Sequence, residues 1–193
     1  DVYTGITTMQ MDAGLDTGPI LLQDSIPVTA YETGQSLHNK LAPLGANLLI
    51  HTIRWLSAGS ISPHPQPDNE ALVTYASQIK KEDGEIDWTQ SADEIDRHVR
   101  AFTPWPGTYS HWNGKRIKIL TGYPLSTHMN IAPGEVADTR GAELVSATPF
   151  VIGTGKGVYV PSRVQLAGKQ AVSAEEFING ASDFIGSTLS AEA

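Results

Sequence analysis

The fold of the first part of the chain is decided by residues 1–28, which read DVYTGITTMQMDAGLDTGPILLQDSIPV. Residues 6–11 and 19–28 are rich in β-branched and apolar side chains, a composition that is typical of strands. The segment between them, residues 12–18, carries the glycines and aspartates of a tight connection. We therefore predict two neighbouring strands joined by a turn, in a chain that begins within a domain.

A helical period follows from Thr33, with Gly59 as its stop signal. The apolar residues of one helical stripe are Leu37, Leu41, Leu44, Leu48, Ile53 and Leu56. Pro43 lies within this stretch, and a proline inside a helix removes one backbone donor and crowds the preceding turn. We expect a kink at this point, or a short helix that ends there and is followed by a second helix near Leu44.

The stretch 59–70 contains Pro63, Pro65 and Pro67 among polar residues, which predicts an extended connector rather than a packed element. The domain boundary is expected after it. The chain is accordingly divided into a first domain over 1–58, a linker over 59–90 and a second domain over 91–193.

The second domain is expected to begin with a short helix and to continue as an all-β structure. Ser91 and Glu94 form a capping box, and Pro104 ends the helix soon afterwards. Residues 108–166 hold five or six short strands, a spacing that favours a small barrel such as an OB-fold. The turn signals between them are Asn113-Gly114, Pro133-Gly134, Arg140-Gly141 and residues 153–157. A final helix over 173–179 begins with a second capping box, formed by Ser173 and Glu176.

Composition narrows the classes of function. The chain has 193 residues, a net charge of -8 and no cysteine, which excludes disulfides and thiolate chemistry and favours a cytoplasmic location. No apolar run approaches the length of a membrane span, so no membrane role is expected. The charge is uneven: residues 1–96 hold 14 acids and 4 bases, whereas residues 97–172 hold 9 bases and 3 acids. Such a basic segment either meets an anionic partner or is a solvated surface.

Two groups of motifs carry a family resemblance. Residues 1–7, DVYTGIT, followed by residues 11–19, MDAGLDTGP, resemble the formyltransferase pattern of enzymes that use 10-formyltetrahydrofolate. Further on, residues 72–76, 80–82, 86–88 and 100–107 resemble the linker and second domain of methionyl-tRNA formyltransferase. The resemblance implies an α/β fold, the rear part of a Rossmann-like catalytic domain, followed by a small all-β OB-like domain that helps to hold methionyl-initiator tRNA.

The same resemblance assigns chemistry to the first residues. The family uses an asparagine, a histidine and an aspartate, and the aspartate matches Asp1. The asparagine and histidine belong to a segment upstream of this motif, so we expect the chain to need that missing N-terminal part and to be inactive alone. Thr4 and Gly5 are expected at the folate donor, because glycine allows close approach of the backbone to a flat ligand; the other reading is that such glycines only make turns. No metal is assigned, since Asp12 and Asp16 lack further ligands.

Contacts with tRNA are predicted from the basic residues, because phosphates attract such charges. The predicted contacts are Lys80, Lys81, Lys115, Arg116, Lys118, Lys156 and Lys169, with Arg163 as a further candidate. Arg97 and Arg100 are given less weight because Asp93 and Asp96 lie four residues before them, the spacing of helix salt bridges. Alternation in the hairpin is expected to point Arg116 away from its basic neighbours. Trp105 is expected to be a buried anchor between helix and barrel.

Two other functions are kept open from the sequence. One retains folate chemistry with a different acceptor, either an amino sugar nucleotide or water. The other is a free-standing OB-like RNA-binding module, which would need no partner domain.

Overall fold

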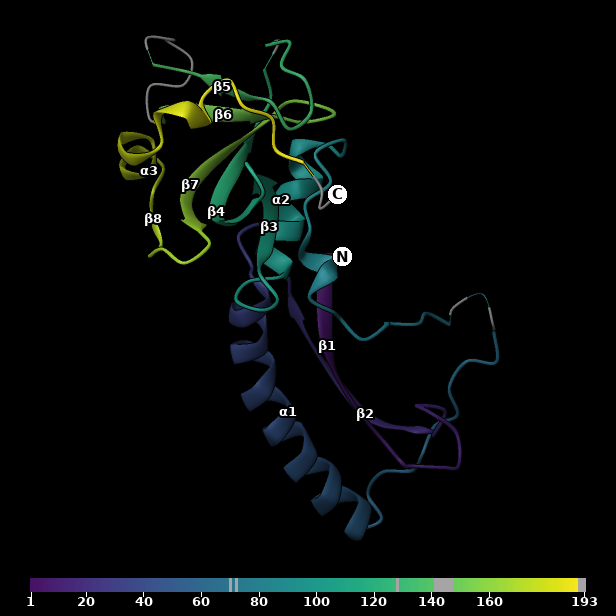
Figure 1. Ribbon diagram of the computed structural model, residues 1–193. Helices are drawn as coiled ribbons and strands as arrows, with labels where there is room; N and C mark the ends of the chain where they lie inside the picture. The colour runs from purple at the N-terminus through teal and green to yellow at the C-terminus, as the bar shows by residue number, and fades with distance from the viewer. Residues whose placement is uncertain (70, 72, 128, 141–147, 191–193) are drawn as a thin grey trace. The chain divides into compact units, whose positions relative to one another are not determined.

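The structure is a computed structural model that describes residues 1–69, 71, 73–127, 129–140 and 148–190 (Figure 1). The chain divides into two compact units, Asp1–Gln78 and Ile79–Ala193, hereafter unit 1 and unit 2. The division falls inside the segment predicted as a linker, residues 59–90. None of the helices in the described part of the chain is long and apolar enough to cross a membrane.

Unit 1 is a β-hairpin with one long helix packed on it (Figure 1). Strands β1 (Tyr3–Met9) and β2 (Ile20–Pro27) pair antiparallel from Tyr3↔Pro27 to Met9↔Ile20, which confirms the two neighbouring strands. Helix α1 (Gly34–Ser57) contacts both strands. A hydrogen bond of 2.8 Å between the hydroxyls of Thr8 and Thr52 joins helix and hairpin in the buried layer.

Helix α1 is continuous through Pro43, so the expected handover to a second helix near Leu44 was wrong. Proline removes a single backbone donor. This loss is offset by packing of the helix against the hairpin after Pro43: Gly45 approaches Ile6, and Thr52 reaches Thr8.

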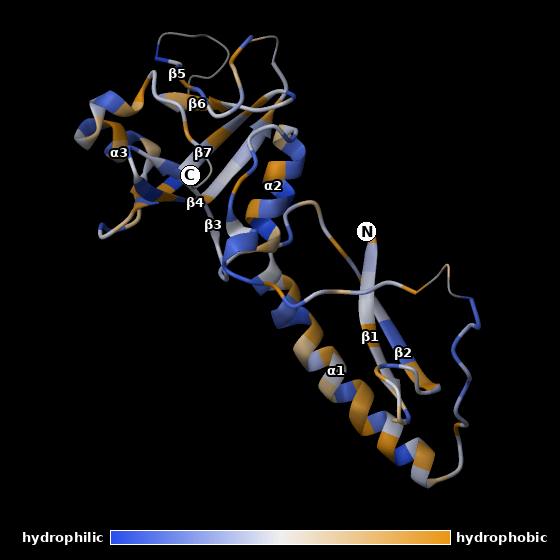
Figure 2. Cartoon of the chain, turned by 45° about the vertical axis from the view of Figure 1, so that its right-hand side comes forward, coloured by the Kyte–Doolittle hydropathy of each residue, from blue (hydrophilic) through white to orange (hydrophobic). Residues whose placement is uncertain are grey.

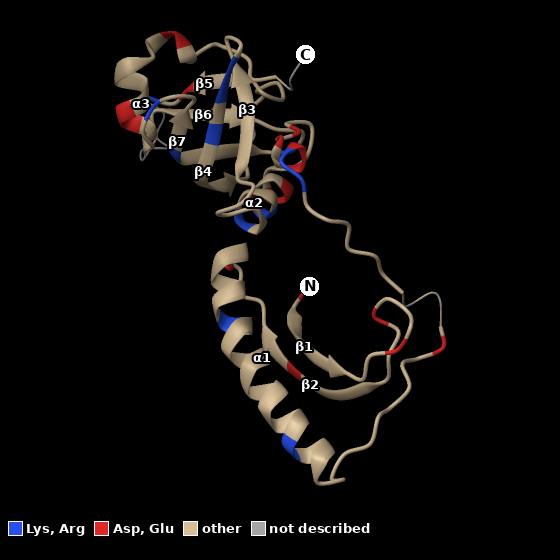
Figure 3. Cartoon of the chain, turned by 60° about the horizontal axis from the view of Figure 1, so that its bottom comes forward, with Lys and Arg blue, Asp and Glu red and all other residues tan. Residues whose placement is uncertain are grey.

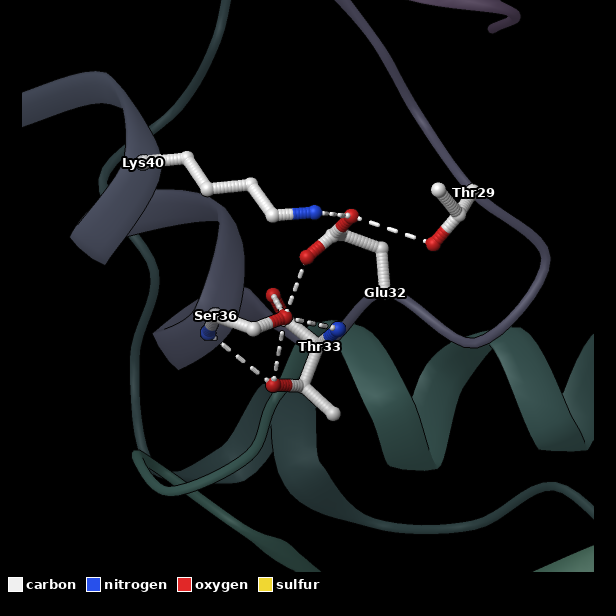
Figure 4. A network of polar contacts seen from close by, with 5 residues as sticks. All are labelled: Thr29, Glu32, Thr33, Ser36 and Lys40. Atoms are coloured by element: carbon white, nitrogen blue, oxygen red, sulfur yellow. Dashed lines mark hydrogen bonds and ion pairs between the residues drawn. The ribbon is translucent and has the colours of Figure 1, made fainter.

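The start of α1 is fixed by a network of five side chains (Figure 4). Thr33 caps the helix and forms a capping box with Ser36. The buried carboxylate of Glu32 accepts hydrogen bonds from Lys40 Nζ at 2.6 Å, from the Ser36 hydroxyl and from Thr29 Oγ1 at 3.1 Å. These contacts, that with Lys40 first, lower the pKa of Glu32 to about 2.

Unit 2 combines one antiparallel sheet with short helices. Its elements are η2 (Glu82–Gly84), α2 (Ala92–Ala101), β3 (Thr108–Trp112), β4 (Lys115–Leu125), β5 (Val136–Asp138), β6 (Phe150–Gly153), β7 (Val158–Leu166), β8 (Val172–Ser173), α3 (Ala174–Gly180) and η4 (Ser182–Phe184). The strand order is β3-β4-β7-β6-β5, and β8 pairs with β7. This α/β architecture with a small, mainly β second unit is the predicted fold class.

The sheet of unit 2 is not closed by a ladder between β3 and β5 within the described residues. The segment 186–190 instead bridges both edges, with Ser190 paired to His111 and Thr188 to Glu135. The sheet is therefore open between β3 and β5 in the described residues, and the segment that follows η4 bridges its two edges.

Local signals in the second unit were accurate. Ser91 and Ser173 both form the predicted capping boxes, with Glu94 and Glu176. The turn between β3 and β4 is made by Asn113 and Gly114 at φ 48° and 71°, which is the backbone form that an Asn-Gly hairpin requires. The predicted turn at Arg140-Gly141 lies partly outside the described residues.

The core lies in unit 2, around edge-to-face aromatic contacts of Trp112, Phe177 and Phe184. Ile86 and Trp88 are buried in the same core, so the end of the predicted linker belongs to unit 2. Trp105, in contrast, is 57% exposed, and its prediction as a buried anchor was wrong. The aromatic part of this core is formed instead by Trp112, Phe150, Phe177 and Phe184.

Candidate functional site

The candidate site of unit 1 is a hollow of about 450 Å³ over the first part of the hairpin. It is lined by Tyr3, Thr4, Gly5, Ile6 and Thr7 from β1 and by Gln23, Asp24 and Ser25 from β2. Thr4 and Gly5, the residues predicted for the folate donor, are both in this lining. Polar side chains and backbone form most of it, which suits a ligand rich in donors and acceptors.

Gly5 is required by the approach of the two strands. A Cβ added at this position would lie 2.2 Å from the backbone oxygen of Asp24. Any other residue would push β2 away and alter the lining of the hollow. The pairing of the two strands therefore requires glycine at position 5 by itself, independently of any ligand.

Asp1 is exposed and stands two residues before β1. The backbone beside it is held in place, because the amide of Val28 donates to the carbonyl of Val2 at 2.9 Å. Asp1, Thr4 and Gly5 thus lie at the same end of the hairpin. Asp1 itself is outside the lining of the hollow.

Asp12 and Asp16 lie at the other end of the hairpin, in the loop that joins β1 to β2. Asp12 Oδ1 accepts from Thr17 Oγ1 at 2.7 Å and from the Gly14 amide at 3.0 Å. These hydrogen bonds, the one from Thr17 first, lower the pKa of Asp12 and tie the carboxylate to its own loop. The part of the chain that the structure describes contains no group of three side chains suited to a metal ion.

In unit 2, strand pairing gathers some of the predicted basic residues. Arg116 and Lys118 alternate with the buried Ile117 and therefore point to the same outer face. The expectation that Arg116 points away from its basic neighbours was wrong for Lys118, because residues two apart share a face; Lys115 is the one on the other side.

A turn at the end of β7 brings further cations to this region. The amide of Ala167 donates to the carbonyl of Arg116 at 2.9 Å, and Lys169 follows in the same turn. Gln165, opposite Lys118, donates to the carbonyl of Lys169 at 2.9 Å. We name this surface the β4–β7 face and define it as Arg116, Lys118, Arg163, Gln165 and Lys169. Figure 3 colours the basic segments of the chain blue and the acidic ones red.

One contact shows how Arg116 is held on the β4–β7 face. Its guanidinium carbon lies 3.9 Å from the ring centre of Tyr109 on the neighbouring strand β3. Neither Tyr109 nor Gln165 was predicted as part of a site, since neither is basic. Their places in the strand register are the signal that would have found them.

The remaining predicted contacts lie elsewhere in unit 2. Lys156 is in the turn before β7, where its carbonyl accepts from the Ala92 amide at 3.0 Å, whereas Lys169 follows the end of the same strand. Lys80 and Lys81 are exposed beside η2, and the Lys80 amide donates to Asp83 at 2.7 Å. The structure therefore does not gather all seven predicted residues into one patch.

Comparison with known proteins identifies the class. Residues 1–53 match the family model described as "Formyl transferase", and residues 78–182 match "Formyl transferase, C-terminal domain". The chain belongs to the formyl transferase family, with both parts present in that order.

Solved structures show the same fold. HypX from Aquifex aeolicus matches 96% of this chain and 32% of its own, at 17% identity and a TM-score of 0.65. An N-formyltransferase from Helicobacter canadensis, in complex with folinic acid and dTDP-3-aminofucose, matches 88% of this chain and 57% of its own, at 20% identity and a TM-score of 0.60. This chain thus spans about a third of the one and somewhat over half of the other.

Proposed function

We propose that the protein transfers the formyl group of 10-formyltetrahydrofolate to the amino group of methionyl-initiator tRNA. The observation that supports tRNA as the acceptor is the β4–β7 face. It groups Arg116, Lys118, Arg163 and Lys169 in a chain whose net charge is -8. A phosphate backbone is attracted by such a face, whereas a small amine acceptor has no need of it. The family match supports the formyl transfer itself.

The reaction explains why a carboxylate is needed. The amine nitrogen forms a bond to the formyl carbon, the bond from that carbon to N10 of the folate breaks, and the proton of the amine ends on N10. An oxyanion develops on the formyl oxygen during this exchange. In the family pattern, Asp1 keeps the histidine charged and helps to move the proton.

The donor is proposed to occupy the hollow next to Asp1. Thr7 and Ser25 offer hydroxyls on the same face of the hairpin, and the backbone at Gly5 is fixed by its close approach to β2. A donor held there would bring its formyl group to the end of the hairpin that carries Asp1.

The first experiment measures formylation by the complete protein that carries this chain. Asp1→Asn keeps the size of the side chain and removes its charge, so we expect the rate to fall by a factor of about 10²–10⁴. Asp68→Asn, at an exposed carboxylate of the connector outside the hollow, is the matched control for loss of one carboxylate and should retain most of the activity. An undiminished rate in Asp1→Asn would refute the catalytic assignment.

The acceptor is tested in the same assay. Methionyl-tRNA, an amino sugar nucleotide and water are offered as alternative acceptors, and only methionyl-tRNA is expected to be formylated. Preference for the sugar nucleotide, or hydrolysis without an acceptor, would replace the proposed function by another folate-dependent reaction. Salt-dependent RNA binding by residues 79–193, with no formylation by the complete protein, would favour the free-standing RNA-binding module.

The β4–β7 face is tested by binding. Removing Arg116 and Lys118 together should weaken tRNA binding and reduce the slope of log affinity against log salt by about 2. Lys115→Ala is the matched control, because Lys115 lies on the same strand and points to the opposite side. An equal loss per removed charge in the control and in the double variant would show that overall charge, not this face, sets the affinity.

A further inference from the structure

The connector that follows α1 is fastened to the hairpin of unit 1 by residues 64–66. His64 and Ile20 exchange two backbone hydrogen bonds of 2.8 and 2.7 Å. On its other side, Ile20 pairs with Met9 of β1. His64 therefore adds a short third strand at the end of the hairpin that carries the loop.

Gln66 makes the second part of this attachment. Its Nε2 donates to the carbonyl of Asp16 and to the carbonyl of Gly18, each at 2.7 Å. The side-chain amide has two hydrogens, and both are used. We name the pairing of His64 with Ile20 and the two bonds of Gln66 the connector latch.

The loop that receives Gln66 is itself well fixed. Its ends are joined by the amide of Gln10, which donates to the carbonyl of Pro19 at 2.9 Å. Inside the loop, Asp12 accepts hydrogen bonds from Gly14 and Thr17. Gln66 thus meets two carbonyls whose positions are already set, which lowers the entropic cost of the latch.

The connector is also prepared for this attachment by its prolines. Pro63, Pro65 and Pro67 alternate with His64 and Gln66, and each proline fixes its own φ and favours extended backbone at the residue before it. An extended segment is the form that adds to a strand edge. Proline has no backbone N–H, so the amide of His64, between two prolines, is the donor that pairs with Ile20 at the edge of β2.

We propose that Gln66 is a positioning residue for delivery of the acceptor, an inference that rests on the proposed function. By closing the latch, Gln66 fixes the point at which the connector leaves unit 1, and shortens the tether, which is the chain between the last attachment to unit 1 and the unit proposed to hold the tRNA. Without the latch, the tether begins at the end of α1 and grows from roughly 12 to roughly 20 residues. Effective concentration falls as about the -3/2 power of tether length, which corresponds to a loss of about twofold.

The test is Gln66→Glu in the complete protein. This change removes both donors and sets carboxylate oxygens against two carbonyl oxygens. We expect hydrogen exchange at the amides of Ile20 and His64 to become about tenfold faster. The KM for methionyl-tRNA should rise about twofold, while kcat and the KM for the folate donor stay unchanged.

Two further variants separate positioning from general damage. Gln66→Lys restores donors toward the same carbonyls and should recover both exchange protection and KM. Gln35→Glu introduces the same charge change in unit 1, at a side chain that donates to Asn39 on the surface of α1, and should leave both readouts unchanged. In Gln66→Glu, exchange protection should partly return at acid pH, where the protonated carboxyl regains one donor.

Two results would overturn the inference. If Gln66→Glu keeps the exchange rates of the wild type, the bonds of Gln66 do not hold the pairing of His64 with Ile20, and Gln66 is not a positioning residue. If exchange becomes faster but KM for methionyl-tRNA is unchanged, the latch exists and does not position the acceptor. Failure of the proposed function appears in the wild-type protein, as an absence of methionyl-tRNA formylation, and is thereby distinguished from failure of the latch.

Discussion

At the scale of single residues, Glu32 is the carboxylate of unit 1 that is held by the most side-chain contacts among the described residues, from Lys40, Ser36 and Thr29. Its pKa is lowered to about 2 from 4.5, so the contribution of Glu32 to stability is present above about pH 4.5 and is lost as the pH falls toward 2. We expect Glu32→Gln to lower the Tm of unit 1 by a few degrees at neutral pH and to flatten its dependence on pH between 4.5 and 2. Thermal melts followed by the helical signal of α1 measure both effects.

Asp138→Asn is the matched control for Glu32→Gln. The pKa of Asp138 is also lowered to about 2, by Arg140, but this pair is exposed to solvent on both sides. Exposed ion pairs contribute little to stability, so this variant should leave the melting temperature of unit 2, the unit that carries Asp138, at the wild-type value. A similar loss in both variants would show that lowered pKa values, and not burial, decide the cost.

Residue-scale predictions from sequence were reliable where the cause is local. Ser91 and Ser173 cap their helices because a hydroxyl and a glutamate three residues on satisfy backbone donors within one turn. Trp105 was misjudged because burial depends on which distant side chains arrive against a ring. The latch residue Gln66 was not predicted for the same reason, since its acceptors lie about 50 residues earlier in the chain.

At the scale of elements, helix α1 keeps a proline in its interior. A proline there costs a hydrogen bond and crowds the preceding turn. We expect Pro43→Ala to raise the free energy of unfolding of unit 1 by about 1–3 kcal/mol. Urea denaturation followed by α1 measures the gain, and Pro67→Ala, in the extended connector, should give none. A destabilised Pro43→Ala variant would show that the proline ring itself contributes packing that exceeds its cost.

Element predictions held where periodicity and turn signals agree. The hairpin of unit 1, the helix after Ser91 and the turn at Asn113 all follow from the short-range pattern. The pairing of β4 with β7 and the closure of the sheet by residues 186–190 depend on contacts across long stretches of chain. Periodicity gives the faces of a strand but not its neighbours, so the β4–β7 face was predicted only in part.

At the scale of the whole molecule, burial is divided unequally between the two units. Every buried hydrophobic residue in the described chain lies between Ile86 and Leu189, in unit 2. In unit 1, side chains of α1 such as Leu49, Ile53 and Trp55 are 45–57% exposed, and Figure 2 shows apolar residues along the length of the helix. The α/β class was predictable from the element pattern, whereas this division of burial was not, because it depends on tertiary contacts.

This division predicts two separate unfolding transitions for the 193-residue chain. Apolar burial is the main favourable contribution to folding, so unit 1 should unfold first, at lower urea, and unit 2 later. We expect amides of α1 to exchange at least about 100-fold faster than those of β4 and β7, and limited proteolysis to leave a resistant product that begins near Ile79. The isolated segment 79–193 should then melt at the temperature of the second transition of the whole chain. A single transition shared by α1 and the sheet of unit 2 would contradict this prediction, because it would require stabilising contacts between the units large enough to compensate for the missing core of unit 1.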